Sequence, residues 1–359
     1  MLRLIVCIML VFCTYISLST ISSQKPLPDP PLPKNTPRSV AILSTSLHPR
    51  YLFTIPVAVA AWRKLGAESL ILFVGDPSLL ETNYHVKITI ALLERLGARI
   101  ILLKNTKLST ATLSQIARLF AASLPASNDF PLNTTFIVSD TDLIPFKLRN
   151  HIPDQTKGYQ LQVYNAIRTS DIEIPPARGN QTVKMYSMLT IGATVQAWRK
   201  IMNFKEANYD SKAIETYAEI EFGKGFFHPN DTEKADLKSS LLWYADQSLL
   251  SYKLEEWKKN PKQLAATYEW LKKPRRMDRQ NWPKKAEFFQ FHKYDFDDAH
   301  VLMWGFDDAG WERFRHFIDW YFADDAISWA LLYDYRDKFA AKPIEGAELL
   351  KDELKKDFV

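Results

Sequence analysis

The sequence is poor in cysteine: it has two, Cys7 and Cys13, and both lie within an apolar run near the amino end. The rest of the chain therefore cannot form a disulfide within itself, so a scaffold stapled by disulfides is excluded for it. Roughly 320 residues remain beyond that run and its flank, and 47% of the whole chain is hydrophobic, which is enough for a sizeable buried core. We expect the fold to depend on that core.

Two kinds of binding motif are also absent. No Gly-x-Gly-x-x-Gly or Walker loop follows the first strand candidate, whose sequel is Ser44-Thr-Ser-Leu-His-Pro-Arg50, so the dinucleotide-binding and ATP-binding forms of an α/β sheet are disfavoured. No long basic stripe is present, because the net charge is +5 and the one tight basic cluster is Lys272-Lys-Pro-Arg-Arg276. We therefore expect no nucleic-acid binding, and we interpret the cluster as a solvated loop or a clamp for phosphate.

The amino end carries a long apolar run, Leu4 to Ile21, with Arg3 as the only charged side chain before it. No clean small-x-small cleavage site follows, so we expect a retained single-pass anchor over residues 4–22, with residues 1–3 in the cytosol, rather than a cleaved signal peptide. Residues 23–38 contain six prolines and are expected to form an extended stem. This topology predicts a body outside the cytosol, where the sequons at Asn133, Asn180 and Asn230 could accept glycans.

Short apolar segments alternate with segments of helical periodicity at the start of that body. The strand candidates are 40–45, 70–74, 100–103 and 135–138, and the helix candidates are 53–65, 86–96 and 113–124. This alternation is typical of a parallel sheet with right-handed crossover connections. We therefore expect an α/β fold.

Two carboxylates, in Asp140-Thr141-Asp142, follow the fourth strand candidate. In a doubly wound sheet the ligand crevice lies at the carboxyl ends of the strands. Mg²⁺ and Mn²⁺ take oxygen ligands and are commonly shared between one or two carboxylates and substrate phosphates. The pattern therefore indicates a metal-diphosphate site, with an acidic turn or a helix cap as the alternative.

The anchor, the proline-rich stem, the four-strand beginning and the strand-end acidic pair together resemble the GT-A type of glycosyltransferase, a Golgi enzyme of type II topology that uses nucleotide-diphosphate sugars. The resemblance covers residues 39–300 as an order of motifs, and residues 139–145 are the segment that looks close residue by residue. It implies a GT-A like, doubly wound mixed sheet flanked by helices over residues 39–303, whose first half binds the nucleotide.

The same resemblance implies roles for individual residues. Asp140 would face the ribose and the metal, and Asp142 would be a direct ligand of Mn²⁺ or Mg²⁺. The nucleotide sugar would also contact residues after the first strand, namely Thr45, Ser46 and Tyr51.

Two further segments are similar to this family. Met185 to Trp198 is similar to its central strand and turn between donor and acceptor, where Gly192 would leave room for the sugar. Trp243-Tyr-Ala-Asp-Gln-Ser-Leu-Leu250 resembles the helix start that faces the transferred sugar in many retaining members, which implies Asp246 and Gln247 as catalytic residues. Without the resemblance, these segments are equally an ordinary strand, turn and helix, with Asp246 as an N-cap.

A histidine downstream of the acidic pair is a third metal ligand in some of these families. His300, in Asp297-Asp-Ala-His, is closer to such a pattern than His292, and a packed or surface histidine is the alternative for both. Lys293, together with Arg275 and Arg276, would neutralise the departing diphosphate. The family's His-x-x-Gly-x-x-Lys-Pro stretch does not occur, which leaves the third ligand and the diphosphate cation open.

The carboxyl-terminal residues 304–359 are rich in aromatic side chains. We expect a helical region packed on the 39–303 domain, because apolar residues recur there at helical spacing, at Trp311, Phe314, Phe317, Ile318 and Tyr321. Stacking of these rings on an acceptor sugar is the alternative.

As a whole, the resemblance implies a metal-dependent, hexosyltransferase-like enzyme that moves a sugar from a UDP- or GDP-sugar to a glycan or glycoprotein, with retention suggested by Asp246 and Gln247. It implies a lumenal domain on a Golgi or ER membrane, or a secreted form if the anchor is cleaved. Two alternatives stay open. One is a catalytically inactive lumenal binding protein with this fold, and the other is a haloacid-type phosphohydrolase, which is disfavoured because its acidic motif follows the first strand of its domain.

Overall fold

The computed structural model describes residues 38–164, 170–227, 241–263, 265–268, 276–292, 295–301 and 305–344. All of them belong to one unit, Pro37–Val359. The predicted anchor, the stem up to residue 37 and the sequon residue Asn230 lie outside the described residues. In the described ranges, no helix combines the length and the apolar character that a membrane span requires.

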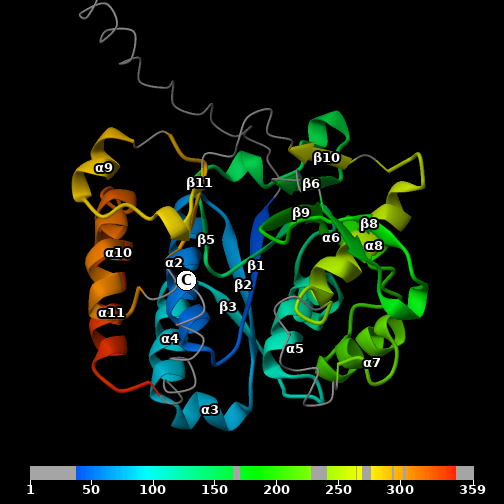
Figure 1. Ribbon diagram of the computed structural model, residues 1–359, viewed down its shortest axis with the longest axis horizontal. Helices are drawn as coiled ribbons and strands as arrows, with labels where there is room; N and C mark the ends of the chain where they lie inside the picture. The colour runs from blue at the N-terminus through cyan, green and yellow to red at the C-terminus, as the bar shows by residue number, and fades with distance from the viewer. Residues whose placement is uncertain are drawn as a thin grey trace, which may run out of the picture. The chain divides into compact units, whose positions relative to one another are not determined.

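The central sheet of the described chain has seven strands in the order β10-β6-β9-β4-β1-β2-β3. Neighbouring strands are parallel except at β9, which is antiparallel to both β4 and β6. The bounds are β1 Ser39–Thr45, β2 Glu68–Val74, β3 Arg99–Leu103, β4 Thr135–Ser139, β6 Leu161–Tyr164, β9 Thr190–Thr194 and β10 Ala265–Tyr268. The predicted mixed α/β sheet flanked by helices is confirmed (Figure 1).

Two smaller sheets accompany it in the described residues. One has the order β11-β12-β5, with β11 at Arg276–Met277, β12 at Asp298–His300 and β5 at Leu143–Pro145. The other pairs β7, Asp171–Glu173, with β8, Thr182–Lys184. The first of them is important for the site, because it joins segments that are far apart in the sequence.

Helices cover both faces of the central sheet (Figure 1). One face packs against α2 (Pro49–Lys64), α4 (Tyr84–Arg95), α10 (Asp308–Tyr321) and α11 (Ala326–Ala340). The other packs against α5 (Thr110–Ala117), the 3-10 helix η1 (Arg118–Ser123), α6 (Val195–Ile201), α7 (Ser211–Phe222) and α8 (Ala245–Lys258). The remaining α-helices of the described chain are α3 (Pro77–Thr82) and α9 (Ala286–Phe291).

Alternation along the strands explains why both faces are covered. In β1, Val40 and Ile42 belong to the cluster under α5 to α8, while Ala41 and Leu43 belong to the cluster under α2 and α10. Successive side chains of a strand point to opposite faces, so a strand that is apolar throughout needs a helical layer on each side. The register Ile42↔Val138 then aligns β1 with β4, the strand before the acidic pair.

The helix boundaries follow the local sequence. Asn83 caps α4 by accepting a hydrogen bond from the Val86 backbone N–H at 3.0 Å, and Gly97 lies beyond its end with φ +81°. The predicted helix over 113–124 is only partly right. It is α-helical up to Ala117 and then tightens into η1, whose Leu119 and Phe120 side chains are buried.

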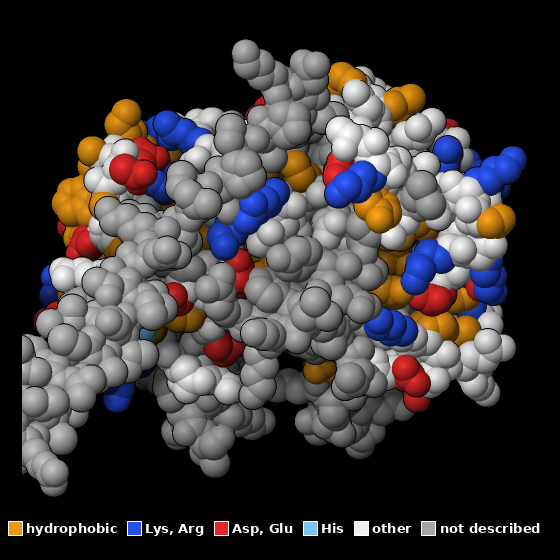
Figure 2. All heavy atoms as spheres, turned by 90° about the horizontal axis from the view of Figure 1, so that it is seen from above, with side chains coloured by type: hydrophobic (Ala, Val, Ile, Leu, Met, Phe, Trp, Pro, Cys, Tyr) orange, Lys and Arg blue, Asp and Glu red, His pale blue; other side chains and the backbone are white. Residues whose placement is uncertain are grey.

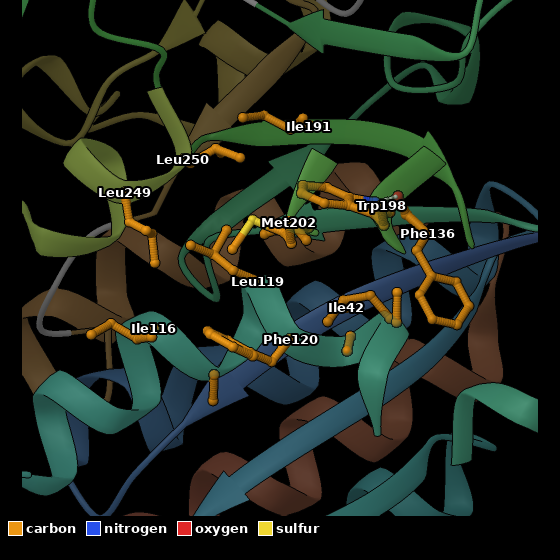
Figure 3. Packing of buried hydrophobic residues seen from close by; sticks show 14 of the residues in the cluster. Ile42, Ile116, Leu119, Phe120, Phe136, Ile191, Trp198, Met202, Leu249 and Leu250 are labelled. Atoms are coloured by element: carbon orange, nitrogen blue, oxygen red, sulfur yellow. Dashed lines mark hydrogen bonds between the residues drawn. The ribbon is translucent and has the colours of Figure 1, made fainter. Parts of the chain in front are cut away.

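Figure 3 shows how this η1 turn packs: Leu119 and Phe120 lie in the same buried cluster as Ile42 of β1 and Met202, which follows α6. Trp198 of α6 fixes the helix to the sheet by donating from Nε1 to the Phe136 carbonyl at 3.0 Å. The buried side chains of Leu119 and Phe120 therefore fix the start of η1, where Arg118 lies.

The predicted apolar face of the carboxyl-terminal region is confirmed. Helix α10 buries Trp311, Phe314, Phe317, Ile318 and Tyr321, the five residues expected from their spacing. Phe314 and Phe317 stack at 5.8 Å between ring centroids. The packed-face interpretation is therefore right, and sugar stacking by these rings is wrong. The boundary expected at residue 303 stays a prediction, since residues 302–304 lie outside the described residues.

Charge is dispersed over the surface, in keeping with the small net charge. Figure 2, which views the molecule from the top of Figure 1, shows Lys and Arg side chains interspersed with Asp and Glu over the described part of that face. The sequon residues Asn133 and Asn180 are exposed.

Candidate functional site

The acidic pair follows β4 directly at the carboxyl edge of the sheet. β1 is flanked by β2 on one side and β4 on the other, so the direction of winding reverses between β1 and β4. Ligands of open α/β sheets bind at such a reversal, outside the carboxyl ends of the strands. The two segments that leave the sheet there begin with Ser46 after β1 and Asp140 after β4.

Asp140 is paired with Arg118, the residue that begins η1. The Arg118 Nη1 group donates to Oδ1 of Asp140 and, at 3.3 Å, to the Ser139 carbonyl. Its Nη2 group donates to Oδ2 of Asp246 at 2.6 Å. The Arg118 side chain is 10% exposed and that of Asp246 is 3% exposed. One buried guanidinium therefore joins the strand-end carboxylate to the first turn of α8.

Burial and neighbouring charges act differently on the pKa values of Arg118 and Asp140. Burial opposes the charged guanidinium, but Asp140 and Asp246 outweigh it and raise the pKa of Arg118 above its ordinary value. Burial raises the pKa of Asp140, and the neighbouring Asp142 charge adds to this, so that Arg118 compensates only in part. The contact between Arg118 and Asp246 is a buried ion pair, and the net stabilisation by such a pair is small but its disruption is costly.

Helix α8 presents its first turn to this pair. Tyr244 is its N-cap residue and makes no side-chain cap, so the alternative in which Asp246 is the N-cap is wrong. Asp246 lies in the first turn, where a carboxylate is favoured by the helix dipole, and its Oδ1 accepts from the Gln247 backbone N–H at 2.8 Å. The Oε1 atom of Gln247 is buried without a hydrogen-bond partner among the described residues.

Asp142 has a different set of partners. β12 pairs antiparallel with β5, which sets His300 opposite Leu143, and the Val301 backbone N–H donates to the Asp142 carbonyl at 2.8 Å. His300 Nε2 lies 3.5 Å from Asp142 Oδ2. Arg279 Nη2 lies 3.3 Å from the same oxygen and also contacts His300 Nε2. The sheet pairing therefore brings an imidazole and a guanidinium to the second aspartate.

The pKa values of Asp142 and His300 are shifted in opposite directions. Burial would raise the pKa of Asp142, but the cations at His300 and Arg279 outweigh it and hold that pKa well below its ordinary value. Burial would lower the pKa of His300, but the carboxylates of Asp142 and Asp278 outweigh it and raise that pKa. The anionic form of Asp142 is thus favoured, as a metal ligand requires.

The donor types fit a hard divalent cation, since they are two carboxylates and one imidazole, with Asp142 and His300 already adjacent. Their present arrangement is nevertheless not a completed ligand set. No group of three His, Cys, Asp or Glu side chains suited to a metal ion occurs within the described residues. Asp140 is engaged by Arg118, and Asp142 and His300 are engaged by Arg279.

The three residues expected to contact the nucleotide lie at or after the end of β1. Thr45 and Ser46 are buried, and the Thr45 hydroxyl donates to the Ser46 carbonyl at 3.3 Å. Tyr51 belongs to the first turn of α2. Burial raises the pKa of its phenol, and the nearby charges of Asp142 and Asp140 raise it further. All three are therefore on the side of the sheet edge that carries the aspartates.

Gly192 does not occupy the predicted turn. It lies in the middle of β9, between Ile137 of β4 and Gln162 of β6. A Cβ atom at this position would lie 1.9 Å from the His151 carbonyl oxygen. The glycine is therefore required by the backbone that crosses the strand, and the expectation that it makes room for a sugar is not supported by this geometry.

Of the three cations predicted to neutralise the diphosphate, one, Arg276, lies within the described residues. Arg276 makes two hydrogen bonds of 2.6 Å to Asp298, whose side chain is fully buried, so its assignment as a free phosphate-binding cation is wrong. Lys293 and Arg275 lie outside the described residues. His292 is exposed and pairs with Asp295 at 2.7 Å, whereas His300 is the histidine beside Asp142.

Two arginines of the site were not found from the sequence. Arg118 belongs to a segment interpreted as an ordinary amphipathic helix, and Arg279 follows a basic cluster without any motif. A buried arginine inside an apolar helical stretch is a usable signal, because it requires acidic partners. Arg279 carries no such signal, since its place depends on strand pairing between β11 and β12.

No family model matches the sequence, and no curated protein matches it. Among solved structures, similarity extends to the galactosyltransferase LgtC in complex with donor and acceptor sugar analogues, at 11% identity and a TM-score of 0.36, over 86% of this chain and 98% of that one. The bifunctional glycosyltransferase WbbM matches at 9% identity and a TM-score of 0.34, over 76% of this chain and 46% of its own.

The glycosyltransferase GlyE of Streptococcus pneumoniae TIGR4 matches at 14% identity and a TM-score of 0.25, over 68% of each chain. These likenesses are distant. They do not by themselves assign a fold family or an activity to this chain.

Proposed function

We propose that this protein is a GT-A type glycosyltransferase that transfers a hexose or related sugar from a UDP- or GDP-sugar to a glycan or glycoprotein acceptor. The observation that carries the proposal is the pairing of Asp142 with His300, with Asp140 two residues before Asp142, at the sheet edge where the winding reverses between β1 and β4. Oxygen and nitrogen donors at this point suit a metal diphosphate.

Each residue then has a distinct task. Asp142, His300 and Asp140 would hold Mn²⁺ or Mg²⁺, which when bound supplies positive charge to the departing diphosphate. Thr45, Ser46 and Tyr51 would contact the nucleotide from the end of β1.

The donor sugar would lie toward α8. The unpartnered Oε1 atom of Gln247 is available to accept a hydrogen bond from a sugar hydroxyl. Arg118 donates to both Asp140 and Asp246 and would therefore position the metal side and the sugar side of the site relative to each other. We propose retention of configuration on the basis of Asp246 and Gln247.

The location in the cell belongs to the same proposal. We propose a lumenal catalytic domain on a Golgi or ER membrane, anchored by residues 4–22. Glycans at Asn133 and Asn180, which are exposed, would support it. Digestion of the body by protease added to the cytosolic side of intact vesicles would contradict it.

The decisive experiment is a panel of nucleotide sugars tested for slow, Mn²⁺-dependent hydrolysis, which requires no known acceptor. We expect one UDP- or GDP-sugar to be hydrolysed, and the Asp142→Asn variant to be inactive while folded. If no nucleotide sugar binds or is hydrolysed, and the Asp142→Ala and Asp246→Ala variants keep the protein's cellular effect, the binding-protein alternative replaces this proposal.

A further inference from the structure

The residues around Asp142 belong to three short strands, which come from three parts of the chain. β5 begins at Leu143, directly after Asp142, and β12 ends at His300. β11 runs parallel to β12, with Arg276 opposite Asp298 and Met277 opposite Ala299, so the next residues, Asp278 and Arg279, continue alongside His300. The segment 276–281, which we name the arginine strap, is thus part of the site.

The strap is firmly held at its beginning. Arg276 forms a bidentate pair with Asp298 at 2.6 Å for both bonds, and the Arg276 side chain is 12% exposed. The Asp278 carboxylate caps the following 3-10 turn by accepting from the Gln280 backbone N–H at 3.1 Å. The backbone of Arg279 is therefore fixed beside the site. Its side chain, at 26% exposed, borders solvent.

The Arg279 guanidinium contacts the two atoms of Asp142 and His300 that would ligate a divalent cation. Its Nη2 group lies 3.3 Å from Asp142 Oδ2 and contacts His300 Nε2. Its Nε group also lies 3.3 Å from His300 Nδ1, so the guanidinium faces both ring nitrogens of this histidine. The Asp278 Oδ2 atom lies 3.8 Å from His300 Nδ1. A carboxylate on the far side of the ring is a frequent companion of metal-bound imidazole.

We propose that Arg279 is an internal competitor of the metal ion. It neutralises Asp142 and covers Nε2 of His300 in the metal-free protein, and it is displaced toward solvent when a divalent cation takes the same two atoms. This inference rests on the metal site of the proposed function. Its consequence is that a higher metal concentration is needed for half-saturation, because only molecules in which Arg279 has left the two ligands can bind the metal.

Binding of Mn²⁺ alone, without nucleotide, tests the proposal on the full-length protein. We expect the Arg279→Gln variant to bind Mn²⁺ at least about tenfold more tightly than the wild type in calorimetric titration. The matched control is Arg315→Gln, which removes the same charge from an exposed pair with Glu312 on α10. It should change the Mn²⁺ affinity by less than about twofold, because exposed charges are screened.

A measurement on the wild-type protein covers the case in which Arg279→Gln does not fold. Modification of Arg279 by an arginine-specific dicarbonyl reagent, followed by peptide mass spectrometry, should accelerate when Mn²⁺ is added, because the guanidinium is released. Retarded or unchanged modification overturns the proposal.

The outcomes separate this proposal from the proposed function. If the wild type binds Mn²⁺ and Arg279→Gln binds it equally or more weakly, Arg279 is no competitor, while the metal site stands. If neither protein binds Mn²⁺, the metal site itself is wrong and the competitor role falls with it.

Discussion

The two carboxylates of Asp140-Thr141-Asp142 are two residues apart and have contrasting surroundings. Asp140 is paired with Arg118, which is buried and shared with the buried Asp246. Asp142 is paired with His300 and with Arg279, whose side chain is about a quarter exposed. The pKa of Asp140 is raised, chiefly by burial, and the pKa of Asp142 is lowered, because its cationic neighbours outweigh burial.

The two aspartates of one short motif thus differ in how firmly their cationic partners are held. A guanidinium that is buried between two carboxylates has no alternative partner, so its pairs belong to the structure. A guanidinium at the edge of solvent can exchange its partners at small cost. We therefore expect substitution of Arg118 to act mainly on stability, and substitutions of Asp142 and its partners to act mainly on binding.

The largest effect is expected for Arg118→Met, which keeps an extended side chain and removes the charge. It leaves the buried Asp246 and the partly buried Asp140 without their cation, and we expect a loss of about 3–5 kcal/mol in the free energy of unfolding. Urea denaturation measures this loss. Arg118→Lys, which keeps the charge but not the two-armed geometry, should lose less. A change below 1 kcal/mol for Arg118→Met, on the order of an exposed pair, would remove the contrast between the two sides.

A smaller effect, on binding, is expected for Asp142→Asn. The amide has the size of the carboxylate but lacks the charge that the metal needs, so Mn²⁺ affinity should fall at least tenfold, or about 1.4 kcal/mol. Calorimetric titration of Mn²⁺ gives the affinity, and urea denaturation in the absence of metal gives the stability. Wild-type affinity for Mn²⁺ in this variant would show that Asp142 is no ligand.

Glu215 on α7 gives a reference carboxylate away from the site. Its side chain is fully buried, accepts from the Lys107 backbone N–H at 2.6 Å and pairs with Lys212. Burial opposes its charge, but these partners outweigh burial and lower its pKa from 4.5 to about 2. Its folded pKa lies below the unfolded one, so its stabilisation is present above about pH 4.5 and is lost as the pH falls toward 2.

We expect Glu215→Gln to flatten the pH dependence of stability in that interval, by on the order of 1 kcal/mol, because Lys212 is largely exposed to solvent. Thermal unfolding between pH 5 and pH 2.5 compares the two proteins. An unchanged slope would show that Glu215 is not stabilised by its partners.

The smallest effect is expected for His292→Ala. Both members of the His292–Asp295 pair are about half exposed, so the free energy of unfolding should change by no more than about 0.5 kcal/mol. Mn²⁺ affinity should stay at the wild-type value, whereas His300→Ala should weaken it. The reverse result would exchange the roles of the two histidines.

Much of the fold was predictable because its information is local. The first four strands and the helices between them follow from apolar runs, caps and glycines, and the buried face of α10 follows from the spacing of five apolar residues. The position of the acidic pair at a sheet edge follows in the same way, since Asp140 comes directly after an apolar strand. The preference for His300 over His292 came from resemblance, and β12 does bring His300 to Asp142.

The partners of these residues were not predictable, because they depend on pairings between distant segments. Gly192 is needed where the His151 backbone crosses β9, and nothing near Gly192 in the sequence indicates that crossing. The sequence indicates Arg276 as a phosphate-binding cation, but the pairing of β11 with β12 sets it opposite Asp298, to which it is hydrogen-bonded. Arg118 and Arg279 likewise acquire their carboxylates through contacts between elements.

The sequence by itself thus determined which elements form and where the acidic residues leave the sheet, since periodicity, capping and strand length are properties of neighbouring residues. Only the tertiary structure decided which cation faces each carboxylate: a buried Arg118 for Asp140, and a solvent-bordering Arg279 with His300 for Asp142. The physical reason is that charge pairing acts over a few ångströms in space, and the sheet order, not the distance along the chain, brings these groups that close.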